Sequence, residues 1–548
     1  MTDGDAAGGP GLAGQSAQEA LEAKYLHGGA DTPIDRDASW RPLIDGEEYF
    51  QALRAQLHQL DDGDRLYIAG LQVDHLVDLS GRGPGDPGYR PLGEQLANLV
   101  DDGVDVRVIM SGGTLWSGRL PRPRFGPFRG NLLAADEMRE IETDKGHVPL
   151  ARRVLLDWSG DLIGTSHQKI VVASHADELT CFVGGIDITE WRYDRPPHDR
   201  YERKGKRWGW HDASGRLRGP AAERVWEAFR LAWLSAGALP VRRYLSPKGQ
   251  LKPLNPRPVT KDLGPPPPQD RPLAPKQSVQ VLRSYGPWHR DSLLPWRRER
   301  SEHLPDGGLQ EIHAALTVAI EAADTYIYIE DQYLREYIGG RPELELYDHL
   351  RDAAERGVKV IMVGSGVRRP DDVGGGPMNT KLNAHVRRKI VARLNDASRK
   401  NFILYRVENL TVHAKIVLID DAFGCVGSAN MFSRSMAGCD HELSAAVVDS
   451  GTAIRDLRVR LWAEHLRLGP VRHPLLEALR DVESALGIWT PEWLPDHMPP
   501  ESWQEPGVPE GFYPTERALA LVEARRPRAA ARKAVGNLTD DAAGTSHR

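Results

Sequence analysis

The feature that most constrains the fold of this chain is an internal repeat, which relates one half of its 548 residues to the other. In each half, an apolar-periodic segment typical of a helix precedes a β-rich run, and a second helical stretch ends at a glycine, Gly103 or Gly357, before a buried strand. The repeated segments are EYFQALRAQLHQL, RLYIAGLQVD and DDGVDVRVIM in the first half and EIHAALTVAIEAA, TYIYIEDQYL and LRDAAERGVKVIMVG in the second. This alternation predicts an α/β protein of two tandem lobes, each a mixed, largely parallel sheet flanked by helices.

Proline separates the two halves. It is too frequent between Leu245 and Gln277 for a helix or a central strand, which indicates an extended linker. Both ends of the chain lack clear periodicity and are rich in small or polar residues, which is typical of disorder. We therefore expect a disordered tail over 1–38, an N-terminal lobe over 39–244, a linker over 245–277, a C-terminal lobe over 278–524 and a second disordered tail over 525–548.

Each half contains one histidine and one lysine separated by a single residue, His167 with Lys169 and His413 with Lys415. On a strand, residues two apart project from the same face, so each pair presents an imidazole beside an ammonium group. If the two lobes meet at these pairs, two imidazoles and two ammonium groups form a site for an anion. One histidine can then attack a phosphodiester while the other protonates the departing alcohol, and the lysines stabilise the charge on the phosphate oxygens.

Acidic and small residues follow both motifs at equivalent places. Asp212 and Glu442 each open the strand that comes after a motif, which is the placement expected if each carboxylate orients one imidazole. The turn after the second motif contains Ser428 and Asn430, where small residues allow the backbone to approach phosphate and the amide can donate to it. The first half has Asp187 in the place of Asn430, and an ionised carboxylate cannot donate in this way.

These residues resemble the phospholipase D superfamily pattern HxKxxxxD followed by a GSxN turn, which the second half matches through Asp420 and Asn430, and the resemblance makes Asp420 a further candidate catalytic residue. The wider segments HQKIVV, GGIDITEWRYDRP, YIYIEDQYL and GSANMFSRSM are similar to the eukaryotic-type catalytic core, over roughly residues 45 to 465. The resemblance implies a covalent phosphohistidine intermediate, with His167 as nucleophile and His413 as acid and then base. It further implies phosphate binding by Lys169, Lys415, Asn430 and Ser428, orientation of the histidines by Asp212 and Glu442, and hydrolysis of a glycerophospholipid such as phosphatidylcholine, with exchange onto a primary alcohol.

The first motif departs from this pattern, because Ser174 stands where the motif has aspartate. Two alternatives therefore remain open: a superfamily nuclease or other phosphodiesterase, or a phosphate- or lipid-binding protein whose first motif is degenerate. His198 and His211 are interpreted as structural or surface histidines.

Composition restricts the partners and the compartment. The formal net charge of −6 gives no basic footprint for nucleic acid, which enters only under the nuclease alternative. The start of the chain lacks the features of a secretion signal, no segment has the apolar length of a membrane span, and the three cysteines lack the paired spacing of a zinc site. We expect a cytoplasmic enzyme that contacts its phospholipid substrate peripherally at a membrane surface and uses neither a metal nor another cofactor.

Overall fold

The computed structural model describes residues 11–28, 32–112, 127–158, 164–198, 200–203, 206–237, 243–245, 251–267, 269, 273, 276–286, 308–332, 346–365, 394–407, 410–431, 433–466 and 474–488.

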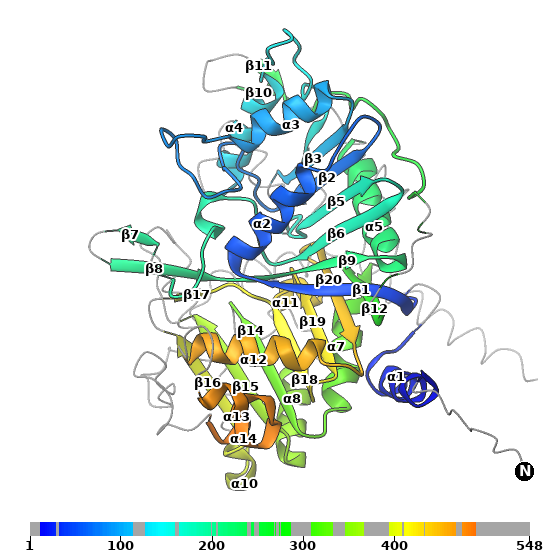
Figure 1. The fold of residues 1–548 in the computed structure, drawn as a ribbon, viewed down its shortest axis with the longest axis vertical. Helices are drawn as coiled ribbons and strands as arrows, with labels where there is room; N and C mark the ends of the chain where they lie inside the picture. Colours follow the sequence, from blue (N-terminus) through cyan, green and yellow to red (C-terminus); the bar gives the residue numbers. More distant parts are fainter. Residues whose placement is uncertain are drawn as a thin grey trace, which may run out of the picture.

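A mixed sheet of 15 strands runs through this described part of the chain (Figure 1). Its strands in the first half are β1 (Asp35–Ile44), β2 (Arg65–Gly70), β3 (Asp105–Ser111), β4 (Val154–Asp157), β5 (Ile170–His175), β6 (Glu178–Gly184) and β9 (Ala213–Arg218). In the second half they are β12 (Gln277–Tyr285), β13 (Leu309–Gln310), β14 (Tyr326–Asp331), β15 (Lys359–Ser365), β16 (Phe402–Val407), β18 (Ile416–Ile419), β19 (Phe423–Gly427) and β20 (Glu442–Val448). The order across the sheet is β16-β15-β14-β18-β19-β20-β12-β1-β9-β6-β5-β2-β3-β4, with β13 beside β12.

The two halves share this sheet instead of building one each. Strand β1 pairs with β9 of its own half and, antiparallel, with β12 of the other half, where Asp35 lies opposite Val279 and Ala38 opposite Gln277. Figure 1 shows β1 crossing the molecule between the upper and lower groups of strands. The pairing satisfies backbone groups that would otherwise form an open sheet edge in each half.

The sheet is mixed, as expected, but it is not largely parallel. Parallel pairs occur only toward its two margins, in β2-β3-β4 and β14-β15-β16, whereas the strands between them pair antiparallel. The reason is the short connection after each HxK motif. Tight turns with positive φ at Ala176-Asp177 and at Asp420-Asp421 join β5 to β6 and β18 to β19, and a turn of this length joins only antiparallel neighbours.

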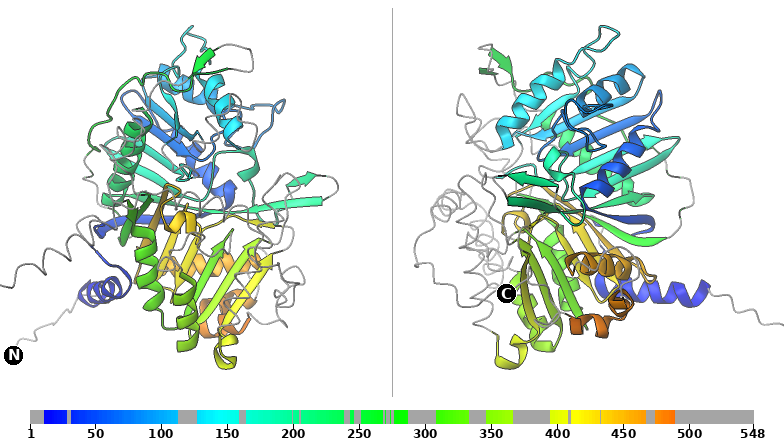
Figure 2. Two further views of the ribbon diagram at one scale, coloured as in Figure 1. Left: turned by 180° about the vertical axis from the view of Figure 1, so that it is seen from behind. Right: turned by 60° about the vertical axis from the view of Figure 1, so that its left-hand side comes forward.

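Helices cover both faces of the sheet (Figure 2). On one face, α5 (Pro220–Gly237) and α12 (Ala453–His465) contribute Trp226, Trp233 and Trp462 to a continuous apolar core that spans both halves. The other face has a separate core in each half. These are covered by α2 (Asp45–Leu57), α3 (Leu92–Asp101) and α4 (Pro127–Arg139) in the first half, and by α7 (Glu311–Glu321) and α8 (Leu346–Arg356) in the second. Gly103 and Gly357 follow α3 and α8 with positive φ, in agreement with their expected role as helix ends.

Apart from the N-terminal helix, four short α-helices, one 3-10 helix and five short strands complete the elements of the described residues. They are α10 (Asp396–Arg399), α11 (Ser433–Met436), α13 (Pro474–Arg480), α14 (Val482–Ile488), η2 (Glu190–Arg192), β7 (Tyr201–Arg203), β8 (Lys206–His211), β17 (Leu410–Val412), β10 (Arg243–Leu245) and β11 (Leu251–Pro253). Strands β10 and β11 pair within the segment interpreted as the linker and its border. The predicted tail over 525–548 lies outside the described residues.

The prediction of disorder over 1–38 is wrong for the described part of that segment. Residues Gly11–Tyr25 form α1, and β1 begins at Asp35. Helix α1 contacts the second half through several polar side chains: Gln18 donates to Ser278 and to the Val448 carbonyl, and the buried Tyr25 donates to Asp420. Its apolar contacts with the core of the second half are made by Leu21 and Tyr25 near its end, which is less than the apolar stripe by which a sequence reveals a packed helix.

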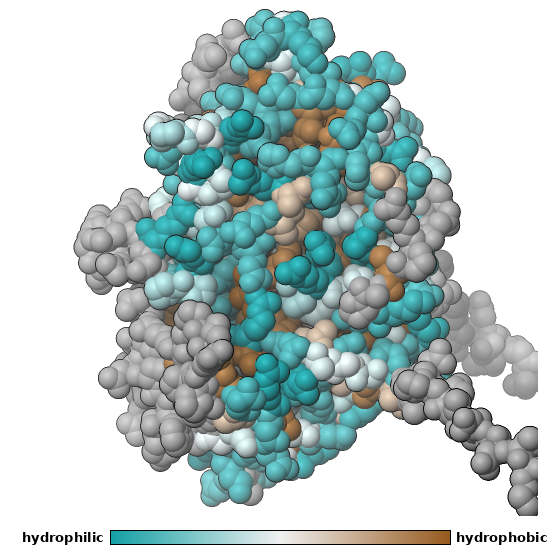
Figure 3. Space-filling view, in the orientation of Figure 1, coloured by the Kyte–Doolittle hydropathy of each residue, from teal (hydrophilic) through white to brown (hydrophobic). Residues whose placement is uncertain are grey.

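The face of the molecule seen in Figure 3 is predominantly hydrophilic, with apolar residues in separated patches. Among the described helices, none combines the length and the apolar character that spanning a membrane requires.

Candidate active site

Strand directions place both HxK motifs at corresponding ends of the sheet. In the first half, β2, β3, β4 and β6 end where β5 and β9 begin, and in the second half β14, β15, β16 and β19 end where β18 and β20 begin. We call this the site end of the sheet. His167 with Lys169 and His413 with Lys415 lie in the extended residues that lead into β5 and β18, just before the ladders that the sequence predicted for them begin.

The two histidines are held across the halves. His167 Nδ1 lies 2.9 Å from Glu442 Oε2 at the start of β20, and His413 Nδ1 lies 2.7 Å from Asp212 Oδ2 just before β9. Each imidazole therefore has its acceptor on the other half of the chain. Orientation of one ring by each carboxylate was expected, and the crossed partnership is a finding of the structure.

Backbone pairing fixes this crossed arrangement. His167 N donates to the His441 carbonyl at 2.9 Å, beside a bridge between Ser166 and His441. On the other side β17 runs parallel to β8, and His413 N donates to the His211 carbonyl at 2.7 Å. Figure 1 shows β8 and β17 together at the junction of the halves. Each motif histidine is thus hydrogen-bonded to the opposite half by both its main chain and its ring.

The carboxylate behind His167 is fixed by two hydroxyl groups. Ser428 Oγ donates to Glu442 Oε2 at 2.5 Å, and Ser435 Oγ donates to Glu442 Oε1 at 2.6 Å. Both serines are fully buried. The expectation that Ser428 binds substrate phosphate is therefore corrected: its hydroxyl is used to hold Glu442. Ser435, which follows the GSAN turn, was not among the candidates.

The carboxylate behind His413 is held differently. Asp212 Oδ1 accepts from the Ala213 amide at 2.9 Å, and Asp212 Oδ2 lies 3.4 Å from Trp210 Nε1. Gly185 lies directly against this carboxylate, because a Cβ at that position would overlap Asp212 Oδ1. The second glycine of the GGID segment is thus needed to seat Asp212.

The two motif lysines are buried, and they interact electrostatically. Lys169 Nζ donates to the His167 carbonyl at 2.8 Å, and Lys415 Nζ donates to the His413 carbonyl. Burial lowers the pKa of Lys415 to about 8 and Lys169 adds to this lowering, while Asp212 and Asp331 oppose it. The charge of Lys169 in the first half thus acts on Lys415 in the second half.

The GGID and GSAN turns use their last residues differently. Asp187 accepts from the Gln72 amide at 2.9 Å and lies 3.4 Å from Lys169 Nζ. In the second half, Asp331 at the end of β14 accepts from the Met431 amide at 2.7 Å. In both halves, a carboxylate that accepts from a backbone amide joins the segment at the end of β2 or β14 to the glycine-containing turn. In the first half the turn supplies the carboxylate, Asp187, and in the second half the strand supplies it, Asp331. Asn430 is consequently not needed for this connection, and its buried Oδ1 has no hydrogen-bond partner among the described residues.

Asp420 is not at the site. It follows β18, seven positions after His413, which corresponds to roughly 23 Å of extended chain. Its carboxylate accepts from the amides of Asp324, Thr325 and Tyr326 at 2.7 to 2.9 Å and from the Tyr25 hydroxyl at 2.8 Å. Asp420 was predicted as a catalytic residue. The structure corrects this, because its carboxylate fastens the far end of β18 to the start of β14 and to α1.

The same position explains Ser174. In the first half, β5 and β2 are fastened at this far end by His175 Nδ1, 2.7 Å from Asp64 Oδ2. The first half thus makes the connection with another pair of side chains. The absence of the motif aspartate leaves the histidine, lysine and carboxylate at the site end unaffected.

The surroundings of His413 disfavour its charged form. Burial, followed by the positive charges of Lys415, Arg192 and Lys169, lowers the pKa of His413 well below its usual value. Arg192 lies over the Trp210 ring at 3.5 Å from the centroid, and the same ring packs on His413 at 5.0 Å between centroids. Arg192 and Trp210 are site neighbours that motif spacing alone did not identify.

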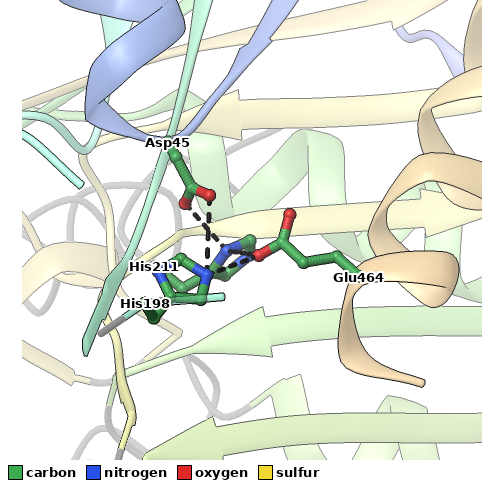
Figure 4. A group of neighbouring side chains, drawn as sticks. All are labelled: Asp45, His198, His211 and Glu464. Atoms are coloured by element: carbon green, nitrogen blue, oxygen red, sulfur yellow. Dashed lines mark hydrogen bonds and ion pairs between the residues drawn. The ribbon is translucent and has the colours of Figure 1, made fainter. Parts of the chain in front are cut away.

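Behind His413, a second polar cluster joins the halves (Figure 4). Asp45, His198, His211 and Glu464 each offer a potential ligand atom, and these atoms lie within 4.8 Å of one another. His211 Nδ1 is 2.9 Å from Asp45 Oδ1, and His198 Nε2 is 2.9 Å from Glu464 Oε1. The sequence indicated no metal site, since these four residues come from separate segments with no ligand spacing.

The chemistry of this cluster suits either protons or a divalent cation. Although burial alone lowers it, the carboxylates Asp45, Asp194 and Glu464 raise the pKa of His198 to about 10, so an ion-pair network forms without a metal. The outer ring nitrogens of His198 and His211 lie 3.1 Å from Asp194 and 2.8 Å from Glu330, an arrangement common behind metal-bound histidines. Nitrogen and oxygen donors of this kind are able to hold a divalent cation, which would displace the protons.

A duplicated α/β chain that brings one histidine-lysine pair from each half to the site end of the sheet defines a class of proteins that carry out phosphate chemistry with two such motifs. Comparison with known proteins agrees with this class. The family model "Cardiolipin synthase, PLD-like domain" matches residues 316–462. "Phospholipase D1" of Schizosaccharomyces pombe is 27% identical over 436 residues, which cover 60% of this chain and 30% of that protein. "Phospholipase D alpha 1" of Vigna unguiculata is 24% identical over 548 residues, covering 77% and 63%.

The chain thus spans between 30% and 63% of the length of these two relatives. Among solved structures, phosphatidylserine synthase of Haemophilus influenzae Rd KW20 aligns with a TM-score of 0.49 and 12% identity, over 87% of this chain and 98% of that chain. The family match and the curated relatives show that this chain is similar to the phospholipase D superfamily, in particular to its eukaryotic-type members.

Proposed function

We propose that this protein is a phospholipase D-type phosphodiesterase that hydrolyses glycerophospholipids such as phosphatidylcholine to phosphatidic acid and the free headgroup alcohol. The observation that carries the proposal is the crossed pair of histidine-carboxylate contacts, His167 with Glu442 and His413 with Asp212, beside two buried lysines. A carboxylate on Nδ1 leaves Nε2 of each ring for chemistry and fixes the tautomer that this requires.

In the first half-reaction, His167 Nε2 attacks phosphorus and the bond from phosphorus to the headgroup oxygen breaks. The departing oxygen takes a proton from His413 Nε2. Lys169, Lys415 and the Asn430 amide stabilise the non-bridging oxygens as their charge changes. The product of this step is a phosphatidyl group bound to His167.

In the second half-reaction, His413 accepts a proton from water while the water oxygen attacks phosphorus and the bond to His167 breaks. Phosphatidic acid then leaves, and both histidines return to their starting states. A primary alcohol that replaces the water gives exchange of the headgroup by the same steps.

The low pKa of His413 requires that the acid be charged by substrate binding. A phosphodiester carries one negative charge, which offsets the positive charges of Lys415 and Lys169 that disfavour imidazolium. We therefore propose that His413 takes up a proton as the substrate enters.

The test is choline release from phosphatidylcholine, supplied as vesicles and as a short-chain monomer, with and without ethanol. The intact protein is compared with His167→Ala, His413→Ala and the control His58→Ala, whose imidazole is exposed at the end of α2. We expect release to fall at least about a thousandfold in the first two variants and to persist in the control. Phosphatidylethanol should form when ethanol is present.

Single-stranded DNA is assayed beside the lipids. Cleavage of DNA without choline release would replace the lipid substrate by a nucleic acid. Vesicle binding with no turnover of either substrate would leave only a binding role.

A further inference from the structure

Three large hydrophobic side chains in the described parts of the chain are conspicuously exposed: Leu76 at 53%, Trp191 at 45% and Val148 at 44%. Leu76 lies in the loop after β2 and Trp191 in the segment after β6, so both follow strands that finish at the site end of the sheet. Val148 precedes β4 and therefore lies at the opposite end. Two of the three exposed side chains thus accompany the proposed catalytic residues.

The segments that present Leu76 and Trp191 are joined to each other and to the site. Gln72 N donates to Asp187 Oδ1 at 2.9 Å, and Asp187 Oδ2 lies 3.4 Å from Lys169 Nζ. One step farther from the lysine, Asp74 N donates to the Ile188 carbonyl at 2.8 Å, beside a parallel bridge between Val73 and Ile188. Leu76 and Trp191 each stand three residues beyond this bridge. Leu76 and Trp191 are therefore both close along the chain to a contact that lies one step from Lys169.

The loop that carries Leu76 is internally fastened. The Leu76 amide donates to Asp74 Oδ1 at 3.0 Å, and Tyr89 donates to the Leu76 carbonyl at 2.5 Å. The backbone that holds the exposed side chain is thus hydrogen-bonded on both sides. The loop's own hydrogen bonds therefore fix the backbone from which the Leu76 side chain is exposed.

Charge restricts the partner. Asp74 and Glu190 lie beside the exposed pair with their carboxylates accessible to solvent. Such charges repel a nucleic acid or an anionic bilayer, whereas a zwitterionic phospholipid surface presents a cationic group at its outer limit. Tryptophan and leucine suit such a surface, since their apolar parts bury among lipid chains at the boundary of the headgroup layer.

We propose that Leu76 and Trp191 form the surface by which this protein seats its site end on a zwitterionic phospholipid layer. This inference rests on the proposed lipid substrate and adds to it the residues that contact the bilayer. Docking through this pair directs the lysine side of the site toward the headgroup layer, so the phosphodiester reaches Lys169 while the acyl chains remain in the bilayer.

The test compares the double variant Leu76→Ala/Trp191→Ala with the intact protein and with Val148→Ala, a matched loss of exposed apolar surface at the other end of the sheet. Choline release is measured on phosphatidylcholine vesicles and on dihexanoylphosphatidylcholine below its micelle concentration. Sedimentation with vesicles of phosphatidylcholine or of phosphatidylglycerol is measured in parallel.

We expect the double variant to lose about tenfold or more in vesicle binding and in vesicle turnover, because two apolar side chains no longer enter the bilayer. Its turnover of the monomeric lipid should stay within about twofold of the intact value, and Val148→Ala should match the intact protein throughout. Phosphatidylglycerol vesicles should bind the intact protein more weakly than phosphatidylcholine vesicles.

The inference is overturned if the double variant sediments with phosphatidylcholine vesicles as well as the intact protein does, or if turnover of monomer and vesicle falls equally. Sedimentation does not require turnover, so it still decides the inference if choline release is absent and the proposed function fails.

Discussion

The two motif histidines have equivalent positions but unequal support. Two serine hydroxyls hold both oxygens of Glu442 behind His167, whereas Asp212 behind His413 receives one backbone amide and contacts Trp210. A carboxylate with two hydroxyl donors has fewer free rotations, so it fixes the His167 ring more firmly. The better fixed ring suits the nucleophile, whose attack direction is geometrically demanding.

Ser435 tests this reasoning. Removal of its hydroxyl in Ser435→Ala deletes one hydrogen bond to a charged group, and we expect kcat to fall roughly tenfold with less than about twofold change in KM. Ser435→Thr, which keeps the hydroxyl, should recover most of the rate. Equal activity of the alanine variant and the intact protein would show that Ser428 alone positions Glu442.

Lys415 predicts a pH limit. Its pKa of about 8 means that the ammonium group is charged below this pH and neutral above it, so kcat/KM should decline as the pH rises through about 8. The alkaline limb of the pH profile of kcat should lie at a higher pH than that of kcat/KM, because bound phosphate favours the charged form of Lys415. In Lys415→Arg the guanidinium stays charged, and the alkaline limb of whatever activity remains should move upward. An unchanged limb would assign it to another group.

Asp420 predicts a loss of stability without a loss of chemistry. Asp420→Asn removes the charge that accepts three amides and a tyrosine hydroxyl, and we expect the free energy of unfolding to fall by about 2 kcal/mol. Below its melting temperature, the variant should retain kcat within about threefold. Ser174→Asp, which restores the motif letter in the first half, should not raise activity, since that position also lies away from the site end. A rise in kcat would contradict the structural interpretation of both positions.

At the scale of elements, sequence reasoning succeeded where a pattern is local. The glycine after α3 follows from neighbours along the chain and the structure places it as expected, whereas His167 and Lys169 lie just before the strand on which their spacing predicted them. The interpretation of Asp420 was wrong because membership of a motif was taken for membership of the site. The number of residues along β18 distinguishes membership of the motif from membership of the site, since the two ends of an extended strand lie far apart.

Helix α1 shows a second limit of sequence reasoning. Its hydrogen bonds with the second half involve Gln18, Glu22 and Tyr25, and these partners lie hundreds of residues away. No periodicity signals such anchors.

Deletion of residues 1–27 should therefore destabilise the second half. The deleted segment donates to Ser278, Val448 and Asp420, and we expect the free energy of unfolding to fall by about 2 to 3 kcal/mol through lost hydrogen bonds and exposure of the surface beneath Tyr25. Thermal melting measures the change. Lys24→Ala, which removes the ion pairs of a partly exposed lysine with Asp324 and Asp420 and its contact with the Tyr25 ring, serves as the control and should alter stability by less than about 1 kcal/mol. A deletion that melts like the intact chain would make α1 dispensable for the fold.

At the scale of the molecule, the crossed contacts could not be read from the sequence. The repeat gave Asp212 and Glu442 equivalent positions, but which ring each carboxylate meets depends on how the halves are placed. That placement is set by β1 against β12 and β8 against β17, pairings of long sequence separation. The continuous core beneath α5 and α12 stabilises the same placement.

The cluster of Asp45, His198, His211 and Glu464 predicts a response to metal ions. Its first three residues belong to one half and Glu464 to the other, so a cation held by all four would oppose their separation. At a free concentration a hundredfold above Kd, such binding adds about 2.7 kcal/mol to stability.

The measurement is thermal melting after treatment with a chelator, followed by addition of calcium, manganese or zinc ions separately. We expect at least one ion to raise Tm, and Glu464→Gln to abolish the rise. Glu477→Gln, an exposed change on α13, should keep it. Melting that is indifferent to every ion would leave the cluster as a proton-linked ion-pair network.

The crossed contacts also bear on how such a chain can originate. An arrangement in which each half completes the histidine of the other requires only one kind of half, present twice, so two identical copies of an ancestral short chain would suffice to build both reaction centres. Fusion of the copies then releases each from the need to match the other. The differences between Asp187 and Asn430, and between Ser174 and Asp420, are the kind of divergence that a fused gene permits and an assembly of identical copies does not.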